Sequence, residues 1–147
     1  MLDFMNEAIR EAKKALKKNE VPIGAIVVLH NKIIGRGFNK REKSQNAIKH
    51  AEIIAIEKAC KKLKSWRLDE AEIYVTLEPC PMCAGAIANA RIKKLVYASK
   101  EHSSEDNLCE KILTSNRLNH KTEIVYDAKY NEVCSKMLTE FFKNKRK

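Results

Sequence analysis

The spacing of hydrophobic residues changes several times along the first half of the chain, and each change predicts a new element. Residues 5–16 carry apolar side chains three or four positions apart with lysines between them, which predicts an amphipathic helix. Residues 21–29 are an almost unbroken apolar run and predict a buried strand. His30-Asn31-Lys32 predicts a turn, after which residues 33–38 return as the hairpin partner. Residues 39–48 are polar without a period and predict a loop.

The second half of the chain alternates between helical and strand patterns. Residues 49–63 regain helical spacing, and residues 71–77 alternate apolar and polar side chains as a strand does. Pro81 favours a helix start, because proline is tolerated at the first helical position. The face of the 49–63 helix expected to enter the core consists of Ile53, Ile56, Ala59, Cys60 and Leu63. The remaining elements expected are a strand over residues 94–98, a short helix over 108–113, a strand over 123–126 and a helix over 130–142.

A hairpin followed by strand–helix–strand units predicts an α/β fold. We expect a three-layer α-β-α arrangement, in which a mixed sheet of about five strands carries helices on both faces. The length suits one domain, residues 1–147, and a chain of this size buries roughly 70% of its unfolded surface. No apolar run approaches the ~20 residues that a membrane helix needs, and the first residues lack the apolar segment of a secretory signal. These patterns predict a cytoplasmic protein without membrane contact.

The charge balance is strongly basic. There are 29 Lys and Arg residues against 19 Asp and Glu, which gives a formal net charge of +10. Such a balance favours anionic partners, of which nucleic acid is the common one. Only seven of the basic residues are arginine, however, and a lysine-rich composition with abundant Asn and Ile is also what an A+T-rich genome produces. Charge alone therefore leaves nucleic-acid binding and codon bias as open alternatives.

Two short motifs carry the candidate chemistry, namely His50-Ala51-Glu52 and Pro79-Cys80-Pro81-Met82-Cys83. Each falls where a helix is expected to begin, and helix N-termini favour thiolates over thiols. The chain has five cysteines and no export signal, so disulfides are not expected and a Cys-x-x-Cys pair indicates metal or redox chemistry.

His50, Cys80 and Cys83 together offer three protein ligands for one Zn²⁺ ion per chain. Three ligands with one open position are typical of a catalytic zinc, whereas structural sites usually have four. Glu52 follows the histidine by two residues, so we expect it to move protons beside the metal without binding it. Two alternatives stay open: a redox Cys-x-x-Cys pair, and a structural site closed by Cys109 as fourth ligand. The order H-x-E then P-C-x-x-C, with both motifs at helix starts, favours the catalytic zinc.

Further segments surround these motifs and carry a family resemblance. They are Glu20–Ala25 (EVPIGA), Gly37–Asn39, His50–Ile53, Tyr74–Cys80 (ending in TLEPC), Met82–Ala86 and Phe141-Phe142. With them the chain resembles the bacterial tRNA adenosine deaminases of the cytidine deaminase superfamily, over about residues 4–142. The metal motif is specific to the superfamily, and EVPIGA and TLEPC narrow the resemblance to the tRNA branch.

The resemblance implies a cytidine deaminase-like fold and a zinc-dependent enzyme that converts adenosine to inosine at the wobble position of a tRNA. The partners it implies are the anticodon stem-loop and a second copy of the chain in a homodimer. It assigns proton transfer to Glu52, with His50, Cys80 and Cys83 as the zinc ligands. The substrate-binding residues it implies are Asn39, whose amide would bond the flipped base, Val21, which would line the pocket, and Ala51, whose N–H would contact the base.

The chain departs from the family pattern in two places, residues 46–49 before the zinc histidine and the glycine-free residues 100–107. These departures leave open which tRNA is preferred, and the roles of His102 and Phe142 are open as well. Two other functions remain as alternatives: a deaminase of free guanine or cytosine with the same fold, and a non-catalytic RNA-binding subunit with structural zinc. The basic charge and the EVPIGA and TLEPC segments favour the tRNA enzyme over the first, and Glu52 argues against the second.

Overall fold

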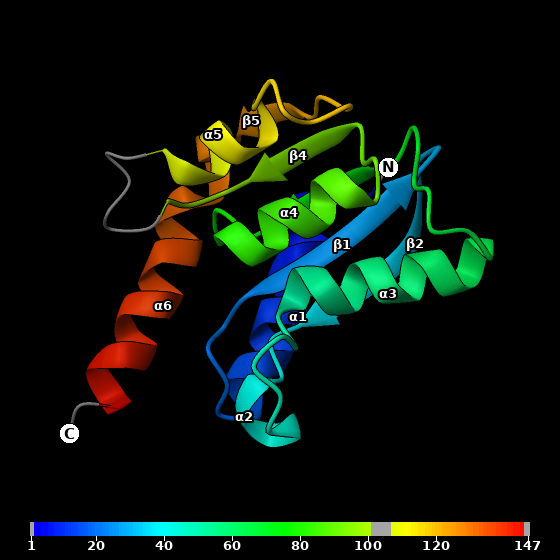
Figure 1. Ribbon diagram of the computed structural model, residues 1–147. Helices are drawn as coiled ribbons and strands as arrows, with labels where there is room; N and C mark the ends of the chain where they lie inside the picture. Colours follow the sequence, from blue (N-terminus) through cyan, green and yellow to red (C-terminus); the bar gives the residue numbers. More distant parts are fainter. Residues whose placement is uncertain (1, 101–106, 146–147) are drawn as a thin grey trace.

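The computed structural model describes residues 2–100 and 107–145. A five-stranded mixed sheet lies between two layers of helices (Figure 1), which confirms the predicted α/β architecture. The spatial order is β2-β1-β3-β4-β5, with antiparallel pairing of β1 to β2 and to β3, and parallel pairing of β3 to β4 and of β4 to β5. The strands are β1 (Gly24–Leu29), β2 (Lys32–Phe38), β3 (Glu72–Val75), β4 (Lys94–Tyr97) and β5 (Glu123–Tyr126).

The helices divide between the two faces of the sheet. One face packs against α1 (Phe4–Lys17) and α6 (Asn131–Lys145), and the other packs against α3 (Ala51–Leu63), α4 (Pro81–Asn89) and α5 (Leu108–Leu113). Two shorter elements complete the chain order, the one-turn helix α2 (Arg41–Ser44) and a 3-10 turn, η2 (Ala128–Tyr130). Among the described helices, none is long and apolar enough to cross a membrane.

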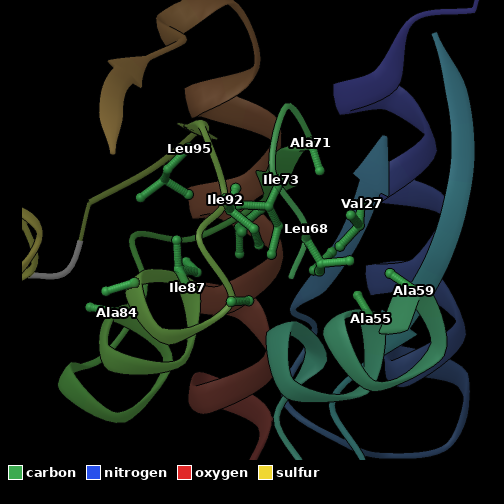
Figure 2. Close-up of a cluster of buried hydrophobic side chains, with 14 of the residues drawn as sticks. Val27, Ala55, Ala59, Leu68, Ala71, Ile73, Ala84, Ile87, Ile92 and Leu95 are labelled. Carbon is green, nitrogen blue, oxygen red and sulfur yellow. The ribbon is translucent and has the colours of Figure 1, made fainter. Parts of the chain in front are cut away.

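Strand β1 is buried on both faces, as its unbroken apolar run predicts. Ala25 and Val27 pack on the side of α3 and α4, whereas Ile26 and Val28 pack on the side of α1. Figure 2 shows Val27 beside the small side chains of Ala55 and Ala59 on α3. The small residues on this helix let it approach the sheet closely, so the position of α3 is set by backbone contact.

Glycines in the hairpin make this close approach possible. A Cβ atom at Gly37 of β2 would lie 2.3 Å from the Ala51 carbonyl oxygen and 2.8 Å from the Ala55 nitrogen. A Cβ at Gly24 of β1 would lie 2.1 Å from the Ala8 carbonyl oxygen of α1. Since neither distance leaves room for a side chain, these glycines fix how near the two helices come to the sheet.

The structure corrects three details of the sequence prediction. The expected loop over residues 39–48 contains helix α2, and β1 begins at Gly24 rather than residue 21, because Val21 to Ile23 lie outside the ladder that pairs β1 with β2. The expected inner face of the 49–63 helix is also partly wrong. Ile54 is buried, whereas Leu63 is 36% exposed.

Candidate metal centre and adjoining pocket

The two sequence motifs meet because two helices start beside each other. His50 is the N-cap residue of α3, and Cys80 is the N-cap residue of α4, directly after the segment that follows β3. That end of β3 is tied to β1: the Gly24 N–H donates to Thr76 Oγ1 at 3.1 Å, and the Thr76 N–H donates to the Gly24 carbonyl at 3.0 Å. The sheet therefore holds the segment that leads into α4, and the contacts of His50 with Cys80 and Cys83 show that α3 starts beside it.

The three candidate ligands converge on one point. His50 Nδ1 lies 3.7 Å from Cys80 Sγ and 3.7 Å from Cys83 Sγ, and all three atoms lie within 4.8 Å of one another. An ion bound at ~2.0–2.1 Å from nitrogen and ~2.3 Å from sulfur, at tetrahedral angles, separates the two atoms by about 3.6 Å. One imidazole nitrogen and two sulfurs also suit a borderline-soft ion. The three residues could therefore hold a zinc-sized metal ion.

The sulfur atoms form a strongly polarised pair. A hydrogen bond from the Cys83 thiol lowers the pKa of Cys80 to about 5, with further help from the backbone N–H groups of Cys83 and Met82 and from the charge of His50. The same hydrogen bond raises the pKa of Cys83, as do burial and the nearby Glu52 carboxylate. The lowered pKa favours the thiolate form of Cys80, which is the form that binds a metal.

Cys109 does not complete a four-ligand site within the described part of the chain. It lies on α5 with 4% of its surface exposed, and the group of mutually close ligand atoms contains only His50, Cys80 and Cys83. Burial raises the pKa of the Cys109 thiol to about 12, with smaller contributions from Glu78 and Glu52. Its packing among the core residues explains why it is a cysteine here. Within the described residues, this geometry favours a three-ligand centre over a structural site closed by Cys109.

A cavity of about 520 Å³ opens beside this centre. The structure brings six of the seven residues singled out from the sequence to its walls, and the seventh, Cys83, is buried behind them. His102, the other histidine of interest, lies outside the described residues. The lining residues that the sequence predicted are Val21, Asn39, His50, Ala51, Glu52 and Cys80. The sequence analysis left the role of Phe142 open and assigned no site role to Arg41, Glu78, Lys100, Ser135, Leu138 and Thr139, which also line the cavity.

Helix α6 supplies one wall of this cavity although little of it is buried. Its buried residues are Cys134 and Phe141, whereas Phe142 is 45% exposed. Figure 1 shows the second half of α6 extending beyond the sheet. The residues facing the cavity, Ser135, Leu138, Thr139 and Phe142, recur three or four positions apart, which places them on one side of the helix. This helical spacing and the family resemblance at Phe141-Phe142 were the signals in the sequence for this wall.

Asn39 has a fixed orientation at the mouth of the cavity. It is 7% exposed, and its backbone N–H donates to the Ile23 carbonyl at 3.2 Å. Its side-chain atom facing the Arg41 N–H at 3.2 Å must be the oxygen, because that partner is a donor. No described residue accepts a hydrogen bond from the Asn39 Nδ2 group, so Asn39 offers the pocket a donor.

A second hollow of about 810 Å³ adjoins the first and shares Val21, Asn39, Arg41 and Phe142 with it. We call it the basic groove. Its acidic lining residues are Glu20 and Glu42, and Glu20 is buried with its carboxylate bound to backbone. Positive charge is dense here, since Lys43 lowers the pKa of Lys18. The cationic residues of the groove are Lys17, Lys18, Arg41, Lys43 and Lys145.

Comparison with known proteins agrees with this geometry. Residues 1–146 match the MafB19-like deaminase family. The tRNA-specific adenosine deaminase of Bacillus subtilis is 46% identical over 145 residues, covering 98% of this chain and 89% of that protein. A solved structure from work on A-to-I editing by tRNA:A34 deaminases at the wobble position is 37% identical, with a TM-score of 0.77 over 84% of this chain and 96% of that one.

A more distant solved structure, a guanine deaminase from Bacillus subtilis, is 30% identical with a TM-score of 0.65, and covers 96% of this chain and 92% of that one. The chain thus shares more sequence identity with the deaminases of tRNA than with this deaminase of a free base. The sequence motifs, the three-ligand centre and the full-length match agree. The chain therefore belongs to the tRNA-specific adenosine deaminase family of the cytidine deaminase superfamily.

Proposed function

We propose that residues 1–147 form one zinc-dependent deaminase domain. It converts adenosine to inosine by hydrolytic deamination at the wobble position of a tRNA anticodon loop. One observation carries the proposal: the His50, Cys80 and Cys83 ligand set and the buried Glu52 carboxyl adjoin a single cavity, which opens toward a basic groove. The cavity volume lies within the roughly 300–1,000 Å³ typical of small-molecule sites. It can therefore hold one flipped nucleoside while the RNA backbone stays outside.

The reaction needs a water molecule activated near neutral pH. Zinc held by His50, Cys80 and Cys83 would supply Lewis acidity that lowers the pKa of water to about 7. Glu52 accepts a proton from the water that attacks C6 of adenine, and then delivers protons to the ring nitrogen and to the leaving amino group. The C6–N bond breaks, ammonia leaves and inosine remains. Glu52 is 4% exposed, so it is shielded from bulk water during these transfers.

Base recognition falls to three residues on the cavity wall. Asn39 donates from Nδ2 to an acceptor of the purine ring, because the bond from the Arg41 N–H orients the amide with Oδ1 toward α2. Ala51 is fully buried at the first turn of α3, where its backbone N–H has no partner within the helix and can reach the base. Val21 covers the base with an apolar side chain.

The basic groove supports an RNA substrate. Five cationic side chains line it next to the cavity, and such side chains bind phosphates without reading sequence. A base in an anticodon loop is already unpaired, so moving it into the cavity costs less than extruding it from a duplex. The dense lysines thus have a use at this position, which favours binding over codon bias as the origin of the groove's charge.

Two alternatives lose support. A deaminase of free guanine or cytosine would have no use for a cationic groove continuous with its pocket. A non-catalytic RNA-binding subunit would have no use for an acid buried beside three metal ligands.

We further propose that the protein is a cytoplasmic homodimer. Its large exposed apolar side chains, among them Trp66 at 60% exposure and Met82 at 36%, support self-association, which sedimentation velocity would measure.

The decisive experiment is incubation of the purified, zinc-loaded protein with a tRNA that carries adenosine at the wobble position, followed by detection of inosine by sequencing. We expect inosine at that position alone. The same preparation is offered free guanine and free cytosine, with ammonia release as the measurement. Ammonia from a free base without inosine in tRNA would establish the free-base alternative. Absence of both activities in a protein that retains one zinc per chain would favour the non-catalytic alternative.

A further inference from the structure

Glu20 is a buried acid outside the metal centre. It lies between α1 and β1 and is 1% exposed. Its two carboxylate oxygens accept hydrogen bonds from two consecutive backbone N–H groups, that of Glu42 at 3.1 Å and that of Lys43 at 2.6 Å. These donors are 22 and 23 residues away in sequence and lie in the first turn of α2. Glu20 thus joins the end of α1 to a helix that follows the hairpin.

Helix α2 cannot be expected to form by itself. It has four residues, and helices much shorter than ~12 residues are marginal alone in water. Its N-cap residue, Lys40, makes no side-chain capping bond. The first N–H groups of a helix need acceptors, and a negative charge at that end interacts favourably with the helix dipole. Glu20 supplies both from a distant part of the chain, so it acts as the cap that the local sequence lacks.

The first residue of α2 controls the orientation of Asn39. Arg41 donates its backbone N–H to Asn39 Oδ1 at 3.2 Å, and this contact leaves Nδ2 as the group offered to the cavity. Arg41 also lines both the cavity and the basic groove. A shift of α2 would release Asn39 Oδ1, and the amide could then turn and present an acceptor instead of a donor.

We propose that Glu20 is a positioning residue for base recognition: by capping α2 it holds the Arg41 N–H against Asn39 and so fixes Asn39 as a hydrogen-bond donor to the adenine. This inference rests on the proposed function, because it assigns Glu20 to the recognition of that substrate. Glu20 itself touches neither the base nor the metal.

The first test measures kcat and KM for an adenosine-containing anticodon stem-loop. Glu20→Ala removes both acceptors, and we expect kcat/KM to fall about ten- to a hundredfold, chiefly through KM, as for loss of a buried hydrogen-bonding group. Glu20→Gln also removes the negative charge but keeps one acceptor oxygen, so its loss should be intermediate. Removal of a negative charge beside a basic groove would by itself tighten RNA binding. A drop in both variants therefore identifies lost positioning rather than changed electrostatics.

A double-mutant cycle tests whether Glu20 acts through Asn39. If it does, Glu20→Ala combined with Asn39→Ala should lose about as much kcat/KM as Asn39→Ala alone, because coupled residues are not additive. Additive losses would overturn the proposal. Glu11→Gln is the matched control: Glu11 is 3% exposed, pairs with Lys14 and Arg36, and lies outside both hollows. We expect its kcat and KM to match those of the wild type.

Amide hydrogen exchange gives a readout that does not depend on activity. In Glu20→Ala the N–H groups of Glu42 and Lys43 should exchange about tenfold faster or more, with α1 and α3 unchanged, because only the local cap is lost. Unchanged exchange, or faster exchange with wild-type kcat/KM per folded molecule, would overturn the positioning role. The wild-type protein could fail to deaminate RNA while the Glu42 and Lys43 amides still exchange faster in Glu20→Ala. The proposed function would then be wrong, whereas the capping of α2 by Glu20 would stand.

Discussion

Gly37→Ala tests whether the metal centre depends on the close approach of α3 to the hairpin. The added Cβ would lie 2.3 Å from the Ala51 carbonyl oxygen, where ordinary contact begins at 3.4 Å, so one of the two must move by about 1 Å. The obstacle is backbone, which cannot swing aside as a long side chain can. Overpacking of a core costs about 1–3 kcal/mol, and a clash with backbone belongs at the upper end of this range.

The displacement falls directly on the candidate site. Ala51 lies between His50 and Glu52, and a metal site tolerates only about 0.2 Å of error in its ligand distances. We therefore expect Gly37→Ala to lower the free energy of unfolding by about 3 kcal/mol and zinc affinity by about tenfold or more. Urea unfolding measures the first, and competition with a chromophoric chelator measures the second.

Two other glycines serve as controls. Gly35→Ala would place a Cβ 2.2 Å from the Ala55 carbonyl oxygen, one turn further along α3, so it should destabilise the fold similarly but disturb zinc less. Gly85→Ala in α4 meets nothing within 4 Å and should be neutral or stabilise the helix by up to about 1 kcal/mol. A Gly37→Ala protein with wild-type stability and zinc affinity would refute the reasoning.

Three further predictions concern proton transfer, RNA and pH. Glu52→Ala should lower the deamination rate by about 10² to 10⁴ or more while zinc content stays at one per chain, and near-normal turnover would exclude Glu52 from proton transfer. Affinity for tRNA should fall steeply between about 50 and 200 mM salt, and a flat response would mean that the basic groove does not bind phosphate. Burial raises the pKa of Cys134 to about 12 from an ordinary value of 9.0, so its contribution to stability is complete below pH 9 and is lost as the pH rises toward 12. Between about pH 8 and pH 10.5 the free energy of unfolding should therefore fall less in Cys134→Ala than in the wild type. The difference should reach up to about 1.4 kcal/mol per pH unit above 9. Urea unfolding measures both free energies, and equal falls in the two proteins would contradict the raised pKa.

The parts of the fold that local patterns encode were predictable. Helix α5 and strand β5 have the bounds that the sequence predicted, because their apolar spacing and flanking polar residues are local signals. Helix α2 was missed for the opposite reason: its cap, Glu20, is 22 residues away from Glu42. The inner face of α3 was partly missed because contact with the glycines of β2 selects small side chains there, and hydrophobicity alone favours Ile53 over Ala55.

The candidate site was likewise predictable from the sequence only in part. The ligand motifs could be found because each is contiguous and begins a helix, and the geometry then brings His50 within 3.7 Å of both cysteine sulfurs. For the wall from α6 the sequence offered only the open role of Phe142, because Leu138 and Phe142 reach the cavity only through tertiary packing. Arg41 was missed because its backbone, rather than its side chain, contacts Asn39.

The shallow anchoring of α6 separates the shape of the cavity from the stability of the fold. Glu52 and the three candidate ligands lie at the starts of α3 and α4, which pack into the core, whereas another wall of the cavity belongs to a helix with two buried residues. Substitutions at Leu138, Thr139 or Phe142 therefore alter the width and polarity of the cavity without disturbing the packing around the metal ligands. Substitutions in α6, natural or introduced in the laboratory, can therefore change which nucleotide fits the cavity. The packing of α3 and α4, and with it the stability of the fold, stays the same.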